Sequence, residues 1–387
     1  MTSVGGARQS WSVRWSRTFV SKLRSPRLTS QLGVALGIAF GVCFVTGYVS
    51  HAIQHPPWWF AWPSRPVSLY RVTQGTHVAT GLAALAVLAA KVWAVAPRLL
   101  RWPSWRDVPG LLERAGVLLL VAASVFQLTT GVLNIARWYD AMGFSFTVAH
   151  YWTAWLAIGT LLVHVGVKLP VVRRALTAPV RPVRGLTGLS RRGLLGGVAA
   201  TAGVVTVATV GQTVRPLAAL SVLAPRDPRV GPQGLPVNKS AVGAGVVAVA
   251  GDPGYRLEVV GPGGTLSLSL ADLAARPQHT VDLPITCVEG WSAGARWSGP
   301  RLRELVAEVG ADARSQVTVV SLEQGSPYAS SVVDPDHLQD PLTLLALRLR
   351  GEPLHLDHGY PCRLIAPSRP GVLQTKWVHR LLVERAR

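Results

Sequence analysis

The chain has few cysteines and, over its first half, few acidic residues. Only three of its 387 residues are cysteine, Cys43, Cys287 and Cys362, and none lies in a CxxC motif. A disulfide-stapled scaffold is therefore excluded, and a cysteine-rich zinc site is not indicated. Residues 1–192 contain three Asp or Glu against 21 Lys or Arg, whereas residues 193–387 contain 16 against 18. The net charge of +20 therefore belongs to the first half.

The first half alternates long uncharged segments with basic loops. Five segments are each long enough to cross about 30 Å of hydrocarbon: Gln31–Gln54, Val72–Ala90, Ala115–Ala136, Ala141–Val167 and Gly193–Val214. Arginines gather in the amino-terminal tail and in the loops after the second and fourth segments. Because cytoplasmic loops are rich in positive charge, we expect the amino terminus inside, five crossings and the carboxy-terminal half outside. The basic charge is thus explained by the membrane, and nucleic acid is not expected as a partner.

An arginine pair stands directly before the fifth segment, in Ser190-Arg191-Arg192-Gly193-Leu194-Leu195. Twin-arginine signals are receptor-read addresses in bacteria, and their pathway carries domains that have already folded. The pattern predicts that the twin-arginine (Tat) translocation machinery exports the carboxy-terminal half. Residues 193–214 would then remain as its anchor in the bacterial inner membrane. The alternative is an ordinary fifth span whose arginines follow the positive-inside rule.

Three histidines lie inside the predicted spans, His77 in the second and both His150 and His164 in the fourth. Ionisable side chains within a membrane are costly and mark functional sites. Fourteen residues make about four helical turns, so His150 and His164 share a helix face about 21 Å apart. His77 lies near the outer end of its span, at the depth of His150. Histidines at matched depth predict axial ligands of a haem, and the alternative is hydrogen bonding between helices.

Residues 28–170 resemble the diheme b-type cytochrome subunits of membrane formate dehydrogenases and hydrogenases. In that family the inner haem takes one ligand from the cytoplasmic end of the first span, but residues 27–31 contain no histidine. One haem b on His77 and His150 is therefore expected. His164 either holds a second haem with an unusual partner or has another role. Lys91 is expected to snorkel to the inner surface rather than to ligate iron.

Residues 215–387 have the pattern of an α+β domain. Arg215–Asn238 is rich in Pro and Gly and is predicted to be a linker, and Arg301–Val309 is predicted to be a helix. Strands are predicted at Tyr255–Val260, Thr280–Thr286, Gln316–Leu322, Leu344–Leu349 and Trp377–Val383. No βαβ rhythm connects these elements. The fold class expected for the chain is a membrane α-helical bundle, four spans plus a fifth anchor helix, followed by this α+β domain.

Two motifs stand out in the α+β domain. In Leu283-Pro-Ile-Thr-Cys287-Val-Glu289-Gly-Trp291, a cysteine follows an apolar strand, and Arg296-Trp-Ser-Gly comes shortly after. A thiolate at the head of such a loop suits a soft metal. The second motif begins at His358-Gly-Tyr-Pro-Cys-Arg363 and ends at Gln374-Thr-Lys-Trp377.

The two motifs resemble the sulfite-oxidase family of molybdenum enzymes, most closely its methionine-sulfoxide-reductase branch, over residues 236–385. The resemblance implies a molybdenum–molybdopterin cofactor with Cys287 as the metal ligand. Glu289, two residues from the ligand, is expected to tune the metal. For the alternative of sulfite-type oxidation, Arg296 with Tyr328 would form an anion pocket. It also implies cofactor contacts from Asn238, Ser321, His358, Arg363, Gln374, Thr375 and Lys376. The alternative for Cys287 is a buried thiol or a disulfide with Cys362.

The two redox modules together predict a membrane-anchored molybdopterin oxidoreductase. It would exchange electrons with the quinone pool through its haem and reduce a small S-oxide or N-oxide outside the membrane. The alternatives are a sulfite-type dehydrogenase passing electrons inward and a non-enzymatic haem carrier or sensor. The predicted parts are a basic tail (1–27), a cytochrome domain (28–170), a basic linker (171–192), the anchor (193–214) and the molybdopterin domain (215–387).

Overall fold

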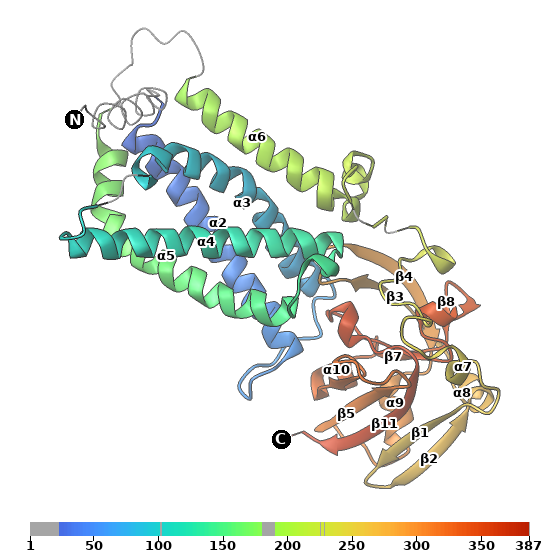
Figure 1. Cartoon of the computed structure of the whole chain (residues 1–387). Coiled ribbons are helices and arrows are strands. Elements are labelled where there is room, and N and C mark those ends of the chain that lie inside the picture. The colour runs from blue at the N-terminus through green and yellow to red at the C-terminus, as the bar shows by residue number, and fades with distance from the viewer. Residues whose placement is uncertain (1–22, 101–102, 180–189, 225, 228, 387) are drawn as a thin grey trace, which may run out of the picture. The chain divides into compact units, whose positions relative to one another are not determined.

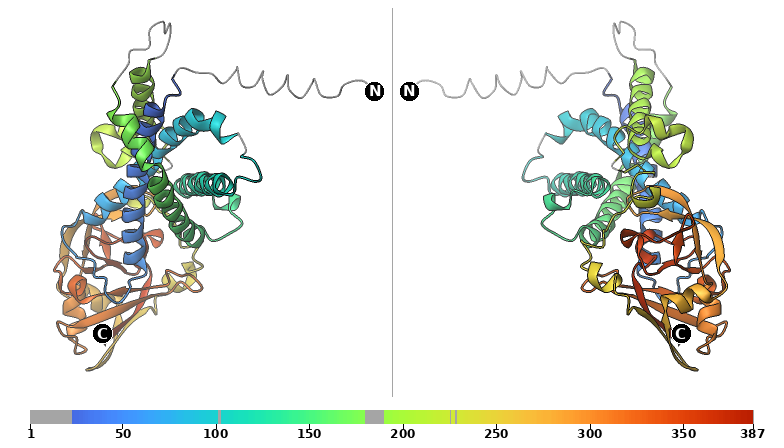
Figure 2. Two further views of the ribbon diagram at one scale, coloured as in Figure 1. Left: turned by 90° about the vertical axis from the view of Figure 1, so that its left-hand side faces the viewer. Right: turned by 90° about the vertical axis from the view of Figure 1, so that its right-hand side faces the viewer.

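The computed structural model describes residues 23–100, 103–179, 190–224, 226–227 and 229–386. They form two compact units. The first comprises the residues up to Thr46 together with Thr76–Thr209, and the second comprises Gly47–Gly75 together with Val210–Arg387. The second unit therefore contains a short amino-terminal segment as well as the carboxy-terminal half. Figures 1 and 2 show the helices and sheets from three sides.

Five helices carry the apolar segments, and each is long and apolar enough to cross a membrane. They are α2 (Pro26–Gln54), α3 (Leu69–Leu99), α4 (Val108–Ala136), α5 (Phe146–Thr177) and α6 (Arg191–Val210). All five predicted segments are thus helical, but the fourth helix begins at Phe146 rather than at Ala141. Residues Tyr139–Ala141 form a separate 3-10 turn, η1.

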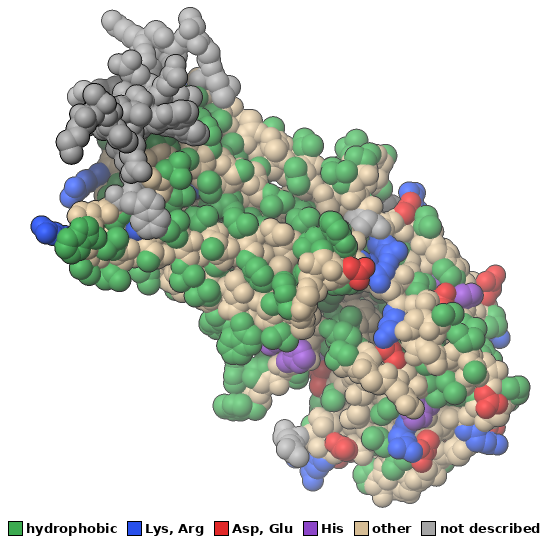
Figure 3. Space-filling model, viewed as in Figure 1, with side chains coloured by type: hydrophobic (Ala, Val, Ile, Leu, Met, Phe, Trp, Pro, Cys, Tyr) green, Lys and Arg blue, Asp and Glu red, His purple; other side chains and the backbone are tan. Residues whose placement is uncertain are grey.

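The surface of these helices is apolar. Figure 3 shows hydrophobic side chains spread over them with few charged groups between. On α5, Leu162 and Val163 are 65% and 69% exposed. Apolar side chains on the outside of long helices suit a hydrocarbon surrounding rather than water.

The main sheet of the second unit has five strands in the order β2-β1-β11-β5-β6. Its strands are β1 (Arg256–Gly261), β2 (Gly264–Ser269), β5 (Ser315–Ser321), β6 (Ser330–Val333) and β11 (Val378–Arg385). Strands β1 and β11 run parallel and the other pairs are antiparallel. Strand β5 alternates buried and half-buried residues along its length. One face of this sheet therefore packs on a core that includes Leu257, Val319 and Leu381.

Two smaller sheets complete the domain. One has four strands in the order β3-β4-β8-β9, and the other pairs β10 with β7. Their strands are β3 (His279–Thr286), β4 (Ser292–Gly299), β7 (Leu344–Ala346), β8 (Arg348–Leu349), β9 (Glu352–Pro353) and β10 (Arg363–Ile365). The prediction of a single strand at Leu344–Leu349 was wrong. This mostly apolar segment changes its hydrogen-bonding partner at Leu347, so its two ends belong to different sheets.

Short helices connect the strands. They are α7 (Val247–Ala250), α8 (Leu270–Ala275), α9 (Leu302–Ala307) and α10 (Pro335–Gln339). Arg301 is the N-cap of α9, so the predicted helix at Arg301–Val309 is present but shorter. The mixture of sheets and short helices makes this an α+β domain. The predicted linker contains two 3-10 turns, η3 (Arg215–Leu220) and η4 (Pro232–Gly234).

The segment between α2 and α3 belongs to the second unit. Arg65 forms an ion pair of 2.7 Å with the buried Asp340. The indole nitrogen of Trp62 donates to the backbone oxygen of Ser368 at 2.7 Å, and Val67 packs against the core beside β3 and β4. The sequence predicted only an outer loop here, because these polar contacts join residues that are about 300 positions apart.

Candidate active site

Cys287 begins a tight loop between β3 and β4. Its backbone N–H donates to the oxygen of Trp291 at 2.9 Å, and the N–H of Gly290 donates back to the oxygen of Cys287 at 3.1 Å. Gly290 has a φ of 94°, a conformation that favours glycine. The loop therefore fixes the cysteine side chain immediately after β3, where the residue is buried.

Hydrogen-bond donors surround the Cys287 sulfur. The amide nitrogen of Asn238 donates to it at 2.8 Å. Burial and the nearby Glu289 raise the pKa of the Cys287 thiol, whereas backbone hydrogen bonds from Glu289 and Val288 and the Asn238 bond act to lower it. Glu289 is itself buried and accepts from the Trp291 indole at 3.1 Å. A sulfur that accepts several hydrogen bonds in a dry pocket is arranged to become a thiolate once a metal cation compensates the burial.

The alternative of a disulfide between Cys287 and Cys362 does not describe this structure. Both cysteines are free. Cys362 lies in the core of the main sheet, where its sulfur is 3.2 Å from the hydroxyl of Tyr255. Burial raises the pKa of Cys362 to about 12, so this thiol is a structural one.

Arg363 is a buried arginine at the start of β10. Its two terminal nitrogens donate to the backbone oxygens of His358 at 3.0 Å and Gln374 at 3.1 Å. The guanidinium lies over the ring of Trp297 at 5.1 Å. Its Nε is buried with no hydrogen-bond partner, and burial lowers the pKa of Arg363 to about 9. A buried cation held only by carbonyl oxygens is a binding group for an anion.

Lys376 is a second cation close to Arg363. Its ammonium donates to the backbone oxygens of Lys239 at 2.5 Å and Asp357 at 2.9 Å. Burial, and secondly the positive charge of Arg363, lower the pKa of Lys376 to about 7. The hydroxyl of Ser321 donates to the backbone oxygen of Lys376 at 2.8 Å, which fixes the position of the lysine. A lysine whose pKa is lowered by the neighbouring Arg363 suits a shared anionic group, whose charge would compensate both cations.

Three more predicted residues lie around this pair. The Gln374 side-chain oxygen is buried without a hydrogen-bond partner, and the Thr375 hydroxyl is 2.7 Å from that of Ser331. The Nε2 of His358 lies 2.7 Å from the backbone oxygen of Pro232. Burial lowers the pKa of His358 to about 4, so this imidazole is neutral and donates to that carbonyl. Orphaned polar atoms beside Arg363 fit a polar heterocycle such as the pterin.

The Cys287 thiol and the two cations Arg363 and Lys376 are connected through one dipeptide and one indole ring. Asn238 donates to Cys287, and the next residue, Lys239, accepts from Lys376. Trp297 packs in the same core as Cys287 and carries Arg363 over its ring. A thiol at one end and cations at the other match a molybdopterin, which has a metal at one end and a phosphate at the other.

One arginine of this region was missed from the sequence. Arg369 is buried and donates to the backbone oxygen of Val332 at 2.8 Å. Its Nε has no hydrogen-bond partner, and its own backbone oxygen accepts from the side chain of Gln374 at 3.3 Å. Burial lowers the pKa of Arg369 to about 10. Arg369 could have been predicted from the sequence, because it lies between Arg363 and Gln374 within the second motif.

Residues from the first two turns of α3 were also missed. Gln74 is buried, and its amide nitrogen donates to the backbone oxygen of Val288 at 2.6 Å, next to Cys287. Tyr70 and Tyr328 are both electrostatic neighbours of the Cys287 sulfur, and burial raises the pKa of Tyr328. The sequence of this predicted span gave no sign that its first turns would support the thiol loop.

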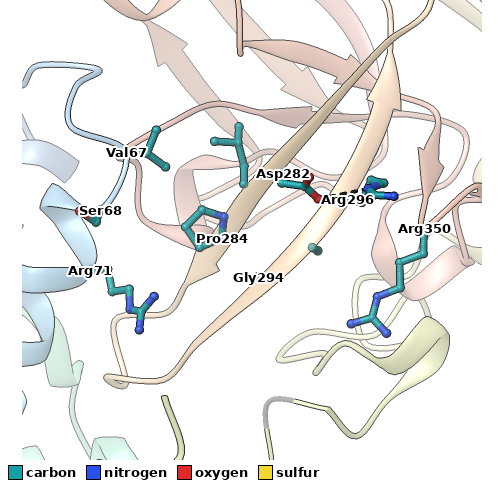
Figure 4. Close-up of a pocket in the computed structure, with 10 residues that line it drawn as sticks. Val67, Ser68, Arg71, Asp282, Pro284, Gly294, Arg296 and Arg350 are labelled. Atoms are coloured by element: carbon teal, nitrogen blue, oxygen red, sulfur yellow. Dashed lines mark hydrogen bonds and ion pairs between the residues drawn. The ribbon is translucent and has the colours of Figure 1, made fainter. Parts of the chain in front are cut away.

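Arg296 does not join this group. It pairs with Asp282 across β3 and β4, at 3.3 Å, on the exposed face of that sheet (Figure 4). Asp282 precedes Cys287 by five residues, which corresponds to about 16 Å along a strand. Arg296 instead lines a separate pocket.

Two histidines face each other in the helical unit. The ring centroids of His77 on α3 and His150 on α5 are 6.4 Å apart, with an angle of 75° between the rings. The Nδ1 of His77 lies 2.9 Å from the backbone oxygen of Cys43, and the Nδ1 of His150 lies 3.0 Å from the hydroxyl of Thr130. Each ring is therefore oriented through Nδ1, which leaves Nε2 as the metal-binding nitrogen.

The separation of these rings fits a shared metal ion. Metal–imidazole bonds are about 2.0–2.1 Å long and a ring centroid lies roughly 1.1 Å beyond its nitrogen, so opposed ligands have centroids about 6.3 Å apart. In the described part of the chain, no group of three or more His, Cys, Asp or Glu could hold a metal ion. Two opposed imidazoles without further ligands fit haem iron, whose porphyrin fills the other positions.

His164 has a different environment. Among the described residues no other imidazole contacts it, and its charged neighbours are Lys91, Lys168 and Glu113. The ammonium of Lys91 donates to the backbone oxygen of Thr29 at 2.6 Å. The structure therefore gives His164 no histidine partner.

Comparison with known proteins bears on the second unit. Residues 244–387 match the family model of the oxidoreductase molybdopterin binding domain. The carboxy-terminal domain is a molybdopterin-binding oxidoreductase domain. Mitochondrial sulfite oxidase of Mus musculus is 36% identical over 162 residues, which cover 34% of this chain and 29% of the mouse chain. The chain thus matches less than a third of the length of that relative.

Two further similarities involve other oxidoreductases. A protein of Azospira oryzae, provisionally named protein-methionine-sulfoxide reductase subunit YedZ1, is 32% identical over 130 residues, which are 33% of this chain and 48% of that protein. Among solved structures, sulfane dehydrogenase SoxCD of Paracoccus pantotrophus aligns with a TM-score of 0.31 and 24% identity, covering 34% of this chain and 38% of that one. The names of the mouse and Azospira relatives both refer to sulfur compounds.

Proposed function

We propose that this chain is a membrane-anchored molybdopterin oxidoreductase that exchanges electrons with the quinone pool through a b-type haem. The observation that carries the proposal is the combination of the Cys287 thiol, in a molybdopterin domain, with the opposed rings of His77 and His150. Substrate would react in the molybdopterin domain and quinone would react in the membrane, so the haem would carry electrons between the two sites.

The residues of the second unit have distinct roles in this proposal. Molybdenum on molybdopterin supplies two-electron oxygen-atom transfer when bound. Cys287 would ligate the metal, and the buried carboxylate of Glu289, two residues away, would tune the metal's potential without binding it. Arg363 and Lys376 would bind the phosphate. The pterin would be contacted by Asn238, Ser321, His358, Gln374 and Thr375.

A neutral substrate, an S-oxide or an N-oxide, suits the surroundings of the thiol. The titratable neighbours of Cys287 in the described structure are Glu289, Tyr70 and Tyr328, with no cation among them. Removing one oxygen atom as water consumes two electrons and two protons. We assign to the half-buried Tyr328, an electrostatic neighbour of the Cys287 sulfur, the donation of a hydrogen bond or a proton to the departing oxygen.

The histidines of the helical unit hold the electron carrier. Hydrogen bonds at Nδ1 orient the rings of His77 and His150 and leave Nε2 available for the iron that these two residues would hold. One haem b is proposed at this pair, because His164 has no histidine partner in the described structure.

Membrane insertion and export follow the distribution of charge. The basic loops place the amino terminus in the cytoplasm and the molybdopterin domain outside the bacterial inner membrane. Arg191 and Arg192 form the first turn of α6 and are the proposed signal for the twin-arginine machinery. Residues 193–214 then anchor the exported domain.

Sulfite oxidation is the second candidate function. It is favoured by the 36% identity to mouse sulfite oxidase, and electrons would flow from substrate to quinone. Oxidation of sulfite requires a cationic site near Cys287 that binds the sulfite anion. Arg296, the cation predicted for that purpose, lies instead on the exposed face of β4.

The proposal is tested by the cofactor content of the purified full-length protein. We expect molybdenum and a bis-histidine b-type haem in equal amounts. His77→Ala and His150→Ala should each lose the low-spin haem spectrum and keep molybdenum, whereas His55→Ala is the control and should keep both. Haem without molybdenum would favour an electron carrier or sensor, and loss of haem only in His164→Ala would refute the proposed pair.

A further inference from the structure

A short segment of the connection between α2 and α3 binds the carboxy-terminal domain. Residues 62–67, called here the strap, belong to the same compact unit as that domain. The backbone N–H of Ser64 donates to the carboxylate of Asp336 in α10 at 2.8 Å. The Arg65 guanidinium donates to both oxygens of Asp340, at 2.7 Å and 2.9 Å. Charged acceptors make stronger hydrogen bonds than neutral ones, so these contacts hold the strap against α10 and its carboxy-terminal end.

The strap also stabilises a strained residue of the domain. The indole nitrogen of Trp62 donates to the backbone oxygen of Ser368 at 2.7 Å and to its hydroxyl oxygen at 3.1 Å. Ser368 is buried and has a φ of 54°. This left-handed conformation is unfavourable for a residue other than glycine and persists where neighbouring contacts stabilise it. The hydrogen bonds from Trp62 are contacts of this kind, so undocking of the strap would free Ser368 to change its conformation.

Ser368 leads into the loop that would hold the cofactor. The next residue, Arg369, is buried, and its Nε has no hydrogen-bond partner in the described structure. Pro370 forms a parallel β-bridge with Thr286, which directly precedes Cys287. The loop that starts at Ser368 therefore carries a buried cation and lies beside the thiol. A change in the conformation of Ser368 would move both parts of this loop.

The residues assigned to the cofactor are enclosed when the strap is docked. Arg363, Arg369, Gln374 and Thr375 are each at most 5% exposed. A ligand that contacts groups this deeply buried is itself enclosed, so its loading and its release both require an opening in the protein. The strap is bound at the start of the loop 368–374, so it opposes the opening of that loop.

The proposed topology keeps the strap away from the domain during loading. Residues 62–67 connect the first two spans and would reach the outer side when these spans insert. The molybdopterin domain would be loaded in the cytoplasm and exported after it has folded. The strap and the domain would therefore meet after export, when the cofactor is already in place. A contact formed in this order can oppose release without hindering loading.

We propose that the strap closes the loaded cofactor site and slows the loss of the molybdopterin. This inference rests on the proposed function, because it requires the cofactor beside Arg363 and Lys376. The cofactor leaves from the undocked state, so its release rate follows the population of that state. Removing a strap contact raises this population by the factor that corresponds to the free energy of the contact, and the release rate rises by the same factor.

Release of pterin from the purified full-length protein tests the strap. Released pterin is oxidised and measured by fluorescence over time. Trp62→Phe keeps an aromatic ring without the N–H donor and should speed release about fivefold, the effect of one neutral donor. Arg65→Gln leaves the buried Asp340 without its cation and should speed release about tenfold. Trp58→Phe is the matched control, since Trp58 is 97% exposed on the same connection, and it should release pterin like wild type.

Hydrogen exchange of the loaded protein reports the opening of the loop directly. The amides of Leu373 and Gln374 donate within the loop, to the backbone oxygens of Pro370 and Gly371, and should exchange faster in both strap variants than in Trp58→Phe. Equal pterin release from the strap variants and wild type would overturn the inference and leave the proposed function untouched. So would release that is accelerated equally in Trp58→Phe. A wild-type protein without pterin would contradict the proposed function, and this inference with it.

Discussion

Replacing Arg363 by methionine should remove the cofactor while leaving the fold intact. In the cofactor-free protein, burial lowers the pKa of Arg363 from 12.5 to about 9. Because one pKa unit corresponds to about 1.4 kcal/mol, the buried charge is unfavourable by about 5 kcal/mol. The arginine also donates to the backbone oxygens of His358 and Gln374, and hydrogen bonds from a charged group contribute about 1.5–3 kcal/mol each.

Arg363→Met removes both the unfavourable buried charge and the two favourable hydrogen bonds, and these contributions to stability nearly cancel. The free energy of unfolding of the cofactor-free variant should therefore lie within about 2 kcal/mol of wild type. When the cofactor is bound, its phosphate would compensate the buried charge of Arg363. Arg363→Met then lacks two charge-assisted hydrogen bonds to that phosphate. That loss weakens cofactor binding by about 3–6 kcal/mol, a factor of about 10² to 10⁴.

The assay compares pterin content with stability. Pterin is released, oxidised and measured by fluorescence after purification, and chemical unfolding of the cofactor-free protein gives the stability. Arg303→Met is the control, since Arg303 is only half-buried and its guanidinium donates to the backbone oxygen of Gln339 in an exposed hydrogen bond. Full pterin content in Arg363→Met would refute the proposed role. Destabilisation of the cofactor-free variant by more than about 4 kcal/mol would instead make Arg363 a structural residue.

Three other variants test separate parts of the molecule. Cys287→Ser should fold and bind haem but lose all turnover at the molybdenum centre, and activity near wild type would end the assignment. Gln74→Leu removes the buried donor to the oxygen of Val288, so the molybdenum EPR signal should shift while the haem spectrum stays unchanged; an unaltered signal would make Gln74 a packing residue. Changing Arg191 and Arg192 to lysine should leave the molybdopterin domain protease-protected on the cytoplasmic side. Normal export would mean that α6 is an ordinary fifth span without a twin-arginine signal.

The parts that could be predicted from sequence depend on local rules. A fixed rise per residue places His77 and His150 at similar depth on their helices, and the structure brings their rings to 6.4 Å. Strands β1, β3, β5 and β11 could be located because their β-branched and aliphatic residues favour the strand conformation. The Cys287 loop follows from an apolar strand that ends at a glycine-containing turn.

The parts that could not be predicted depend on contacts distant in sequence. Residues Gly47–Gly75 belong to the same unit as the molybdopterin domain, yet nothing in their composition signals Gln74 as a donor to the thiol loop. The alternation of β4 directs Trp297 into the core and therefore directs Arg296 outward. Charge alone suggested an active-site role for Arg296, but the register of β3 against β4 decides its place.

The central claim is that one chain passes electrons from a membrane haem to a molybdenum site at Cys287. It is tested by reducing the haem of the purified protein with a quinol analogue, removing the excess and adding methionine sulfoxide. The account predicts rapid reoxidation of the haem in wild type and none in Cys287→Ser, which should carry the same haem. Reoxidation at equal rates in both proteins, or a wild-type protein that binds no haem, would contradict it.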